Sequence, residues 1–290
     1  MTLRDLFEQA PGNVLTVAEL RQHATPGQLA RLVGAGAIRY DGRGTYRLKN
    51  APIAEAIARE RRGVVSHRSA ALHWGLQLVE GVTTTEITVD PSRKQHIAPD
   101  GVRVYYRRVR PDERDGNVTT VVRTILDCAR DLPAPEALAT ADAAVSSGRA
   151  DFEELVDAAA KVRGPGSARV RRVIGWIDPR SQSVLESGAR GALLDGGITG
   201  FVPQFPVKIS TGEIRHADLG HEEARLLIEA ESFLAHTGSV MVGDALRYTE
   251  FAAAGYTVLR FTWSNVMERR PWVVQMVRSA LEHRGISPGA

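Results

Sequence analysis

The chain has 290 residues, of which 43% are hydrophobic and 24% are charged, the composition of an ordinary globular protein of two or three domains. No apolar run approaches the roughly 18–20 residues that a helix needs to cross a bilayer, and the N-terminus lacks the apolar core of a secretory signal. We therefore expect a cytoplasmic protein with no membrane partner. The net charge of +3 permits a nucleic-acid partner without requiring one. The single cysteine, Cys128, excludes an internal disulfide and is expected to be a small buried hydrophobic residue.

The N-terminal segment predicts three short helices followed by a hairpin. Thr16 stands three residues before Glu19, the spacing of a capping box, and Thr25 directly precedes a proline, so both threonines mark helix starts. Two segments that alternate like strands, 37–40 and 45–48, then flank a glycine-containing turn. This order of elements is that of a winged helix.

A winged helix over 1–50 would place the helix that begins at Pro26 in the major groove of double-stranded DNA, with the hairpin as the wing. We predict that the contacts come from amide and basic side chains of these two elements, which are Gln28, Arg31, Arg39, Arg43 and Arg47. The alternative is a small α+β module that binds protein. We favour DNA because both contact elements are basic.

Residues 51–162 predict a second α/β unit in which we find no catalytic pattern. The expected helices and strands are 51–60, 66–74, 85–89, 102–108, 120–131, 134–146 and 151–162. His67 and His73 have no acidic residue near them in the sequence, so we expect them to pack or to cap a helix. The basic cluster around the Gly164-Pro165-Gly166 break predicts solvated surface beside a linker.

Residues 168–290 predict a third domain with the element order α-β-β-β-α-β-α. The expected elements are 181–194, 205–209, 214–219, 225–231, 244–254, 256–263 and 272–283. This order describes a mixed sheet flanked by helices, so the whole chain is predicted to be of the α/β (α+β) class.

Acidic residues gather in the strands of this third domain. Glu229 and Glu231 are two apart on one expected strand and therefore point to one face, and His216 and Asp218 share a face of the preceding strand. If the strands pair, three carboxylates and an imidazole converge at one end of the sheet, where a divalent cation would relieve their repulsion. In the alternative, the acids are satisfied by an ion-pair network with nearby arginines, namely Arg215, Arg247 and Arg260.

Three further polar residues of this domain, Glu186, Asp244 and His236, could be catalytic, but each also has a purely structural interpretation. Glu186 precedes Arg190 by four residues on an expected helix, which favours an ion pair within that helix. Asp244 precedes Arg247 by three residues and allows the same interpretation. His236 follows the acidic strand and could carry a proton, although a single histidine in a loop more often has no such role.

Several motifs of the third domain follow one another over about 110 residues. They are Ser183-Val-Leu-Glu186-Ser, Arg215-His-Ala-Asp218-Leu, Ile228-Glu229-Ala-Glu231-Ser-Phe, His236, Asp244-x-x-Arg247-Tyr248 and Gly255-Tyr-Thr-Val-Leu-Arg-Phe-Thr-Trp263. This run resembles the very-short-patch-repair-like nucleases of the PD-(D/E)XK superfamily, of the DUF559 type. The resemblance implies a restriction-endonuclease-like fold in which Asp218 and Glu229 bind Mg²⁺ or Mn²⁺, with Glu186 and Glu231 nearby.

The resemblance also has one departure, which bears on activity. The superfamily usually has lysine at its third position, and this chain has Glu231 there. Without the lysine, activation of the attacking water would fall to the metal or to His236. The first hypothesis is therefore a Mg²⁺-dependent DNA endonuclease with Asp218, Glu229 and Glu231 as metal ligands and Glu186 and His236 as further catalytic residues.

Softer motifs in the first half of the chain support a second hypothesis. They are Leu29-x-x-Leu32-Val-x-x-Gly, Arg43-Gly-Thr-Tyr-Arg47, Val64-Val-Ser66-His-Arg-Ser-Ala-Ala and Val122-Arg123-Thr-Ile-Leu-Asp127. These motifs resemble the AbiEi-family antitoxins of type IV toxin–antitoxin systems. The resemblance implies a transcriptional regulator whose nuclease-like domain has lost catalysis, with a cognate toxin or a second copy of the chain as partner.

Overall fold

The computed structural model describes most of the chain in two compact units. The first unit comprises Met1–Gly75 and Gly81–Asp127, and the second comprises Leu76–Glu80 and Cys128–Ala290. The residues described are 3, 6–7, 10, 14–34, 38–42, 45–48, 53–93, 100–231 and 238–287. They mix helices with sheets, which confirms the expected α/β (α+β) class. The expected three domains, 1–50, 51–162 and 168–290, have other boundaries than these two units and stay a prediction.

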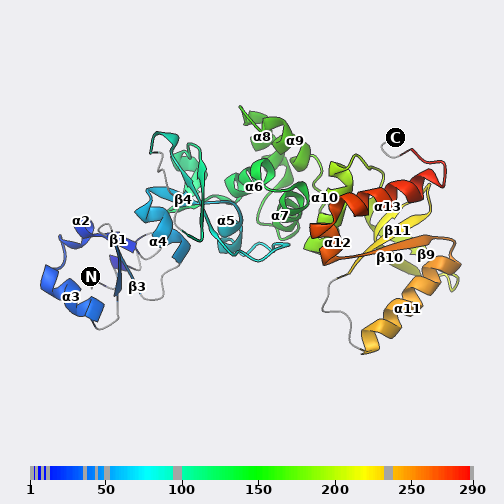
Figure 1. Ribbon diagram of the computed structural model, residues 1–290, viewed down its shortest axis with the longest axis horizontal. Helices are drawn as coiled ribbons and strands as arrows, with labels where there is room; N and C mark the ends of the chain where they lie inside the picture. The colour runs from blue at the N-terminus through cyan, green and yellow to red at the C-terminus, as the bar shows by residue number, and fades with distance from the viewer. Residues whose placement is uncertain are drawn as a thin grey trace. The chain divides into compact units, whose positions relative to one another are not determined.

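Short helices and a three-stranded sheet form the N-terminal part of the first unit (Figure 1). The elements are β1 (Val14–Thr16), α2 (Val17–Leu20), α3 (Pro26–Gly34), β2 (Ile38–Gly42) and β3 (Thr45–Leu48). The expected capping box is present, since the Thr16 backbone donates to the Glu19 carboxylate at 2.6 Å. Strand β1 is an addition to the expected elements, and it pairs antiparallel with β3 to give the order β1-β3-β2.

A small apolar core holds α3 against this sheet. Its buried members come from α2, α3, the two edge strands and the segments beside them, and they are Phe7, Leu15, Leu20, Ala24, Leu29 and Ile38. Because burial of each large apolar side chain contributes about 1.5–3 kcal/mol, this cluster fixes the helix relative to the hairpin. Helices followed by a hairpin are the order expected from the sequence, and the assignment as a winged helix stays a prediction.

The remainder of the first unit is a five-stranded mixed sheet in the order β6-β5-β4-β8-β7. Its strands are β4 (Gly63–Val65), β5 (Thr85–Val89), β6 (Val102–Tyr106), β7 (Arg114–Asp115) and β8 (Val118–Thr119). Its helices are α4 (Ile53–Glu60), α5 (His67–His73) and the larger part of α6 (Val121–Asp131), whose residues from Cys128 onward belong to the second unit. Strands β4, β7 and β8 are additions to the expected elements, because two or three residues are too few to show an alternating pattern.

Helices open the second unit. They are α7 (Ala134–Ser146), α8 (Phe152–Lys161), α9 (Ser167–Ile174) and α10 (Val184–Asp195). Helix α9 corrects the expectation of a linker beside the glycines at 164–166. Its Val170, Val173 and Ile174 are buried, whereas Arg171 and Arg172 are exposed. The basic cluster is therefore one face of an amphipathic helix.

A buried ion pair joins α7 to α10. Arg190 Nη2 lies 2.7 Å from Asp142 Oδ2, and both side chains are buried. The Asp142 carboxylate also accepts from the Asp178 backbone at 2.9 Å. The expected pair between Glu186 and Arg190 within α10 is therefore wrong, because a partner on another helix holds the guanidinium.

A four-stranded sheet follows, in the order β12-β11-β10-β9. The elements are β9 (Val202–Lys208), β10 (Ile214–His221), β11 (Leu226–Glu231), α11 (Gly238–Ala253), β12 (Thr257–Thr262), α12 (Trp263–Glu268) and α13 (Arg270–Glu282). Strands β9, β10 and β11 pair antiparallel, whereas β11 and β12 pair parallel. The mixed sheet agrees with the expected element order, and α12 is an addition to it.

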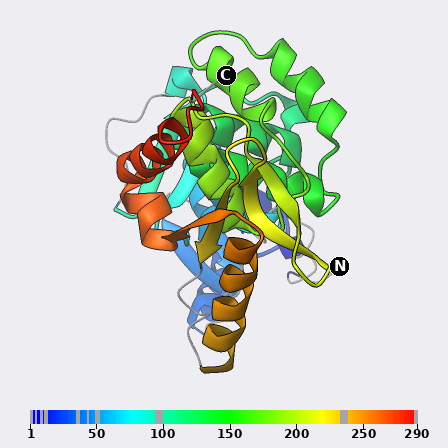
Figure 2. The same ribbon diagram turned by 90° about the vertical axis from the view of Figure 1, so that its right-hand side faces the viewer.

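Helices cover both faces of this sheet. On one face, Leu226 and Ile228 of β11 share a core with residues of α10, α12 and α13. On the other face, Leu227 shares a core with Phe251 of α11. Figure 1 and Figure 2 show α11 on the side of the sheet away from α13. The alternation along β11 therefore directs Glu229 and Glu231 towards α11.

Two features of the composition also have a structural outcome. Cys128 on α6 is fully buried, which confirms that it packs as a small hydrophobic residue. Within the described part of the chain, no helix combines the length and the apolar character that crossing a membrane requires.

Candidate functional site

Strands β10 and β11 bring Asp218 and Glu229 together. Their antiparallel register pairs Leu219 with Ile228, so Asp218 and Glu229 are the next neighbours along the two strands. The Ala230 backbone donates to Asp218 Oδ2 at 2.8 Å, and the Asp218 backbone donates to Glu229 Oε1 at 3.3 Å. These two carboxylates lie side by side, as the strand parity predicts.

The surroundings of this pair disfavour the charged forms of both carboxyl groups. Glu229 is only 2% exposed. Burial raises the pKa of Glu229 to about 8, and repulsion from Asp218 adds to the shift. Burial also raises the pKa of Asp218 to about 6, with further repulsion from Glu186 and Glu231. The positive charge around the pair therefore does not fully compensate the two carboxylates.

One guanidinium from α11 reaches the pair. Arg247 Nη2 lies 3.1 Å from Glu229 Oε2 and 4.0 Å from Asp218 Oδ1. The same nitrogen donates to the His216 carbonyl oxygen at 2.6 Å, and the guanidinium lies over the Phe251 ring. The alternative of an ion-pair network thus holds for Glu229, with Arg247 as the partner.

Glu231 lies in a different environment from the pair. Its carboxylate forms an ion pair with Arg260 of β12, and it accepts a hydrogen bond from the Tyr248 hydroxyl at 2.9 Å. The Arg260 guanidinium lies 4.4 Å from the centre of the Tyr248 ring. Because Arg260 and Tyr248 both engage this carboxylate, the structure does not bring Glu231 to Asp218 and Glu229 as a free third oxygen ligand.

Glu186 lies in the first turn of α10, beneath a serine cap. Its backbone donates to Ser183 Oγ at 3.1 Å, and its Oε2 accepts from the Gln182 backbone at 3.0 Å and from Gln204 Nε2 at 2.9 Å. Gln204 has a φ of 51°, a left-handed conformation that side chains other than glycine adopt at a cost. The Glu186 carboxylate is close enough to raise the pKa of Asp218 and of Glu229.

The remaining predicted residues do not add to this group. The His216 side chain is exposed, so only its backbone carbonyl takes part. His236 and the side chain of Asp244 lie outside the described residues, and their predicted roles stay predictions. Arg215 pairs with Glu213 at 2.9 Å and with Glu250 at 3.3 Å, and it is not a partner of the strand acids.

The donor set fits a divalent cation in part. Asp218 and Glu229 supply buried carboxylate oxygens with incomplete charge compensation, and Mg²⁺ commonly uses one or two protein carboxylates together with water and substrate phosphate. Glu231 does not fit, because Arg260 and Tyr248 hold it. In the part of the chain that the structure describes, no three histidine, cysteine or acidic side chains are grouped to hold a metal ion.

The predicted DNA contacts lie in the N-terminal part of the first unit. Gln28 is exposed on α3, and its side-chain carbonyl accepts from the Thr25 backbone at 2.8 Å, so it also closes a capping box. Arg39 of β2 and Arg47 of β3 occupy directly opposed positions in the antiparallel register. Arg31 belongs to α3, and Arg43 lies outside the described residues.

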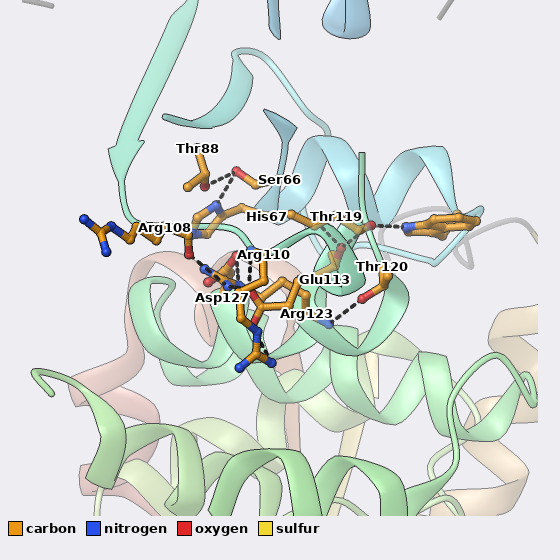
Figure 3. Close-up of polar contacts among 12 residues, drawn as sticks. Ser66, His67, Thr88, Arg108, Arg110, Glu113, Thr119, Thr120, Arg123 and Asp127 are labelled. Carbon is orange, nitrogen blue, oxygen red and sulfur yellow. Dashed lines mark hydrogen bonds and ion pairs between the residues drawn. The ribbon is translucent and has the colours of Figure 1, made fainter. Parts of the chain in front are cut away.

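A buried polar network in the first unit is absent from the sequence predictions. Ser66 Oγ lies 2.9 Å from His67 Nδ1, and it accepts a hydrogen bond from the Thr88 hydroxyl at 2.8 Å (Figure 3). His67 has a φ of 51° and stacks on Tyr105 with ring centres 3.5 Å apart. The expectation that His67 packs is thus confirmed. Of its polar surroundings, the sequence indicated only Ser66, as the residue at which the helix begins.

A second set of polar contacts in the first unit involves one of the motifs from the first half of the chain. Arg123 Nε donates to Asp127 at 2.9 Å, and Arg123 Nη1 donates to Glu113 at 2.6 Å (Figure 3). Nearby, the Trp74 indole donates to the Thr119 carbonyl oxygen at 2.8 Å. The Arg123 and Asp127 side chains of the Val122–Asp127 motif therefore pair with each other inside the protein. His73 has no acidic residue near it in the sequence, but the fold places its Nδ1 atom 3.4 Å from Glu55 Oε1.

Comparison with known proteins gives relatives without assigned functions. No family model matches the chain. The uncharacterized proteins MT2308 and Rv2248, from Mycobacterium tuberculosis strains CDC 1551 / Oshkosh and ATCC 25618 / H37Rv, are each 34% identical to it over 138 residues. The match covers 47% of this chain and 51% of each relative, so the chain spans about half the length of the curated relatives it matches.

Proposed function

We propose that this protein binds double-stranded DNA through its N-terminal winged-helix segment. The observation that carries the proposal is the hairpin register, which sets Arg39 directly opposite Arg47. Two basic residues at opposed positions of one hairpin would be attracted to the negatively charged phosphate backbone of a duplex. Helix α3, with Gln28 exposed and Arg31 in its sequence, supplies the second contact element.

Binding of a labelled duplex to the full chain, followed by fluorescence anisotropy, tests this proposal. Replacing Arg39 or Arg47 by glutamine is expected to weaken binding by about three- to tenfold, or about 0.7–1.4 kcal/mol. The matched control is Arg149→Gln, which removes the same charge from an exposed turn of the second unit and should leave the affinity unchanged. An equal loss of duplex affinity in all three variants would show that only the net charge matters, and it would contradict binding through the hairpin.

The same variants carry an internal check on folding. Removal of either member of the opposed arginine pair is expected to leave the free energy of unfolding unchanged or to raise it by about 0.2–1 kcal/mol. A variant that binds weakly and unfolds at a lower temperature would have lost its fold, and its binding result would not count.

A second candidate activity is metal-dependent hydrolysis of a phosphodiester at Asp218 and Glu229. The observation that favours it is the raised pKa of both carboxyl groups, which marks a buried pair short of positive charge. These two residues would hold Mg²⁺ or Mn²⁺, and the bound ion would supply Lewis-acid activation of the phosphate. Arg247, on α11, would exchange Glu229 for a phosphate oxygen.

Thermal unfolding near pH 8 with and without Mg²⁺ tests the metal site before any cleavage assay. A ligand that binds only the folded state raises the unfolding temperature, so wild type should be stabilised by the ion. Asp218→Asn should abolish the shift, whereas Glu231→Gln should keep it, because Glu231 is engaged by Arg260. If Mg²⁺ still raises the unfolding temperature of Asp218→Asn, the ion binds elsewhere and this candidate activity is contradicted. Nicking of plasmid that disappears in Glu229→Ala would extend the result from binding to cleavage.

If the Mg²⁺-dependent shift is missing while DNA binding is present, the regulator hypothesis is favoured. The second unit would then be a platform for a cognate toxin or for a second copy of the chain, in a cytoplasmic complex. Footprinting on the protein's own promoter, with binding that weakens as salt is raised, would support this assignment.

A further inference from the structure

Five arginines line one pocket of the first unit. The pocket has a volume of about 330 Å³ and lies where α4, β4 and the ends of β5, β6 and β7 meet. The arginines are Arg59, Arg62, Arg93, Arg107 and Arg114. They come from segments far apart in the sequence, so the fold, and not a local run of basic residues, assembles this concentration of charge.

The pocket contains little negative charge to balance them. Its single carboxylate is Asp90, whose oxygen accepts from the Ser92 backbone at 2.8 Å and from the Ser92 hydroxyl at 2.6 Å. Arg59 pairs with Glu19 at 2.6 Å. Arg62 and Arg114 have no carboxylate of the described residues at ion-pair distance. An anion entering the pocket would therefore meet guanidinium groups that are not already neutralised.

An amide group in the same pocket lacks a hydrogen-bond partner. The Nδ2 atom of Asn117 is buried and bonds to no atom of the described residues. The backbone of this residue is held in place, because the Val65 N–H donates to the Asn117 carbonyl oxygen at 2.7 Å. Buried donors in folded proteins are almost always satisfied, so an orphan N–H beside arginines indicates a missing acceptor.

Backbone strain is concentrated at one of these arginines. Arg62 has a φ of 53°, the left-handed region that favours glycine. The next residue, Gly63, is required at its own position, because a Cβ there would lie 2.7 Å from the Thr88 carbonyl oxygen. An arginine in a conformation that it adopts at a cost, at the rim of a cationic pocket, is the kind of strain that accompanies function.

We propose that this pocket binds phosphate groups. Planar guanidinium forks match phosphate oxygens in pairs, and the orphan Asn117 amide adds a neutral donor. The phosphate could belong to the backbone of bound duplex DNA or to a free diphosphate-bearing ligand, which share this chemistry. The proposal does not rest on the winged helix, because a free ligand would fill the pocket in the absence of DNA.

Calorimetric titration of the full chain with inorganic pyrophosphate, and anisotropy with a labelled duplex at the same salt, test the pocket. Arg62→Gly and Arg114→Gln should weaken at least one of the two probes by about tenfold. The exposed Arg149→Gln variant has the same charge change outside the pocket and should bind both probes as wild type does. Arg62→Gly should also raise the unfolding temperature, because glycine relieves the strained φ, and so its loss of binding would not reflect unfolding.

The two probes separate the sources of the phosphate. Weaker pyrophosphate binding with an unchanged duplex affinity assigns the pocket to a free ligand, and the reverse assigns it to the DNA backbone. Arg47→Gln, which tests the hairpin, should leave pyrophosphate binding intact, so failure of the hairpin proposal is distinguishable from failure of this one. Unchanged affinities for both probes in Arg62→Gly and Arg114→Gln would overturn the phosphate pocket.

Discussion

Glu229 and Glu231 share one face of a strand, yet their carboxylates have different surroundings. Glu229 is buried beside Asp218, and burial raises its pKa to about 8. Glu231 is held by Arg260 and Tyr248. Strand parity predicts the shared face, because it depends only on the period of two along the backbone. Parity cannot predict which arginine reaches which acid, since Arg247 and Arg260 arrive from α11 and β12 through the tertiary fold.

The first prediction concerns the dependence of stability on pH at Glu229. The folded-state pKa lies above the ordinary value of 4.5, so between about pH 4.5 and about pH 8 the folded protein holds a proton that the unfolded chain has released. Stability conferred by that proton is present at low pH and is lost as pH rises through the folded pKa. Urea unfolding of wild type should therefore show a decrease in stability across this window.

Glu229→Gln should remove most of this decrease and should be more stable than wild type near pH 8 by about 1–3 kcal/mol. Part of the decrease should remain below about pH 6, where Asp218 titrates from its own raised pKa. If the unfolding midpoints of wild type and Glu229→Gln fall in parallel across the whole pH range, Glu229 ionises in the folded protein as it does in the unfolded chain.

At the scale of elements, the longer helices and the sheet of the second unit follow from the sequence. Helix α7 has the bounds expected at 134–146, because the segment is rich in alanine, the strongest helix former, and has proline only in its first turn. Strand β4, with three residues, has no pattern that could predict it. The partner of Arg190 is also beyond sequence reasoning: four residues separate it from Glu186 along the helix, but the fold places Asp142 of α7 against it instead.

The second prediction concerns this buried pair between α7 and α10. Arg190→Met leaves the Asp142 carboxylate buried without its cation, and it should lower the free energy of unfolding by about 3–5 kcal/mol. The double variant Asp142→Leu with Arg190→Met removes both charges and should recover most of that loss. Chemical denaturation of the three proteins measures both effects, and a double variant as unstable as the single one would show that the arginine acts mainly through its bond to the Trp176 carbonyl oxygen.

For the whole molecule, the modest net charge of +3 conceals an uneven distribution of arginine. The opposed pair on the hairpin and the five arginines of the phosphate pocket both belong to the first unit. An association driven by such clusters releases counterions from DNA, whereas a uniform weak charge would give little salt dependence.

The third prediction is the salt dependence of duplex binding. If the four predicted arginines of the winged helix each neutralise one phosphate, the logarithm of the affinity should fall against the logarithm of the salt concentration with a slope of about −3 to −4. Arg47→Gln should make the slope shallower by about one, and Arg149→Gln should not change it. A slope near zero in wild type would show that the phosphate backbone makes no major contribution.

The five residues from Leu76 to Glu80 belong to the second unit, although the first unit continues on both sides of them. Leu76 is buried, Val79 packs on the core of the second unit, and the Trp263 indole donates to the Val79 carbonyl oxygen at 3.0 Å. The polypeptide passes from one unit to the other three times. Severing the chain at one bond would therefore leave the C-terminal fragment without a piece of its own interior, so shuffling genes at a single junction could not transplant this half intact.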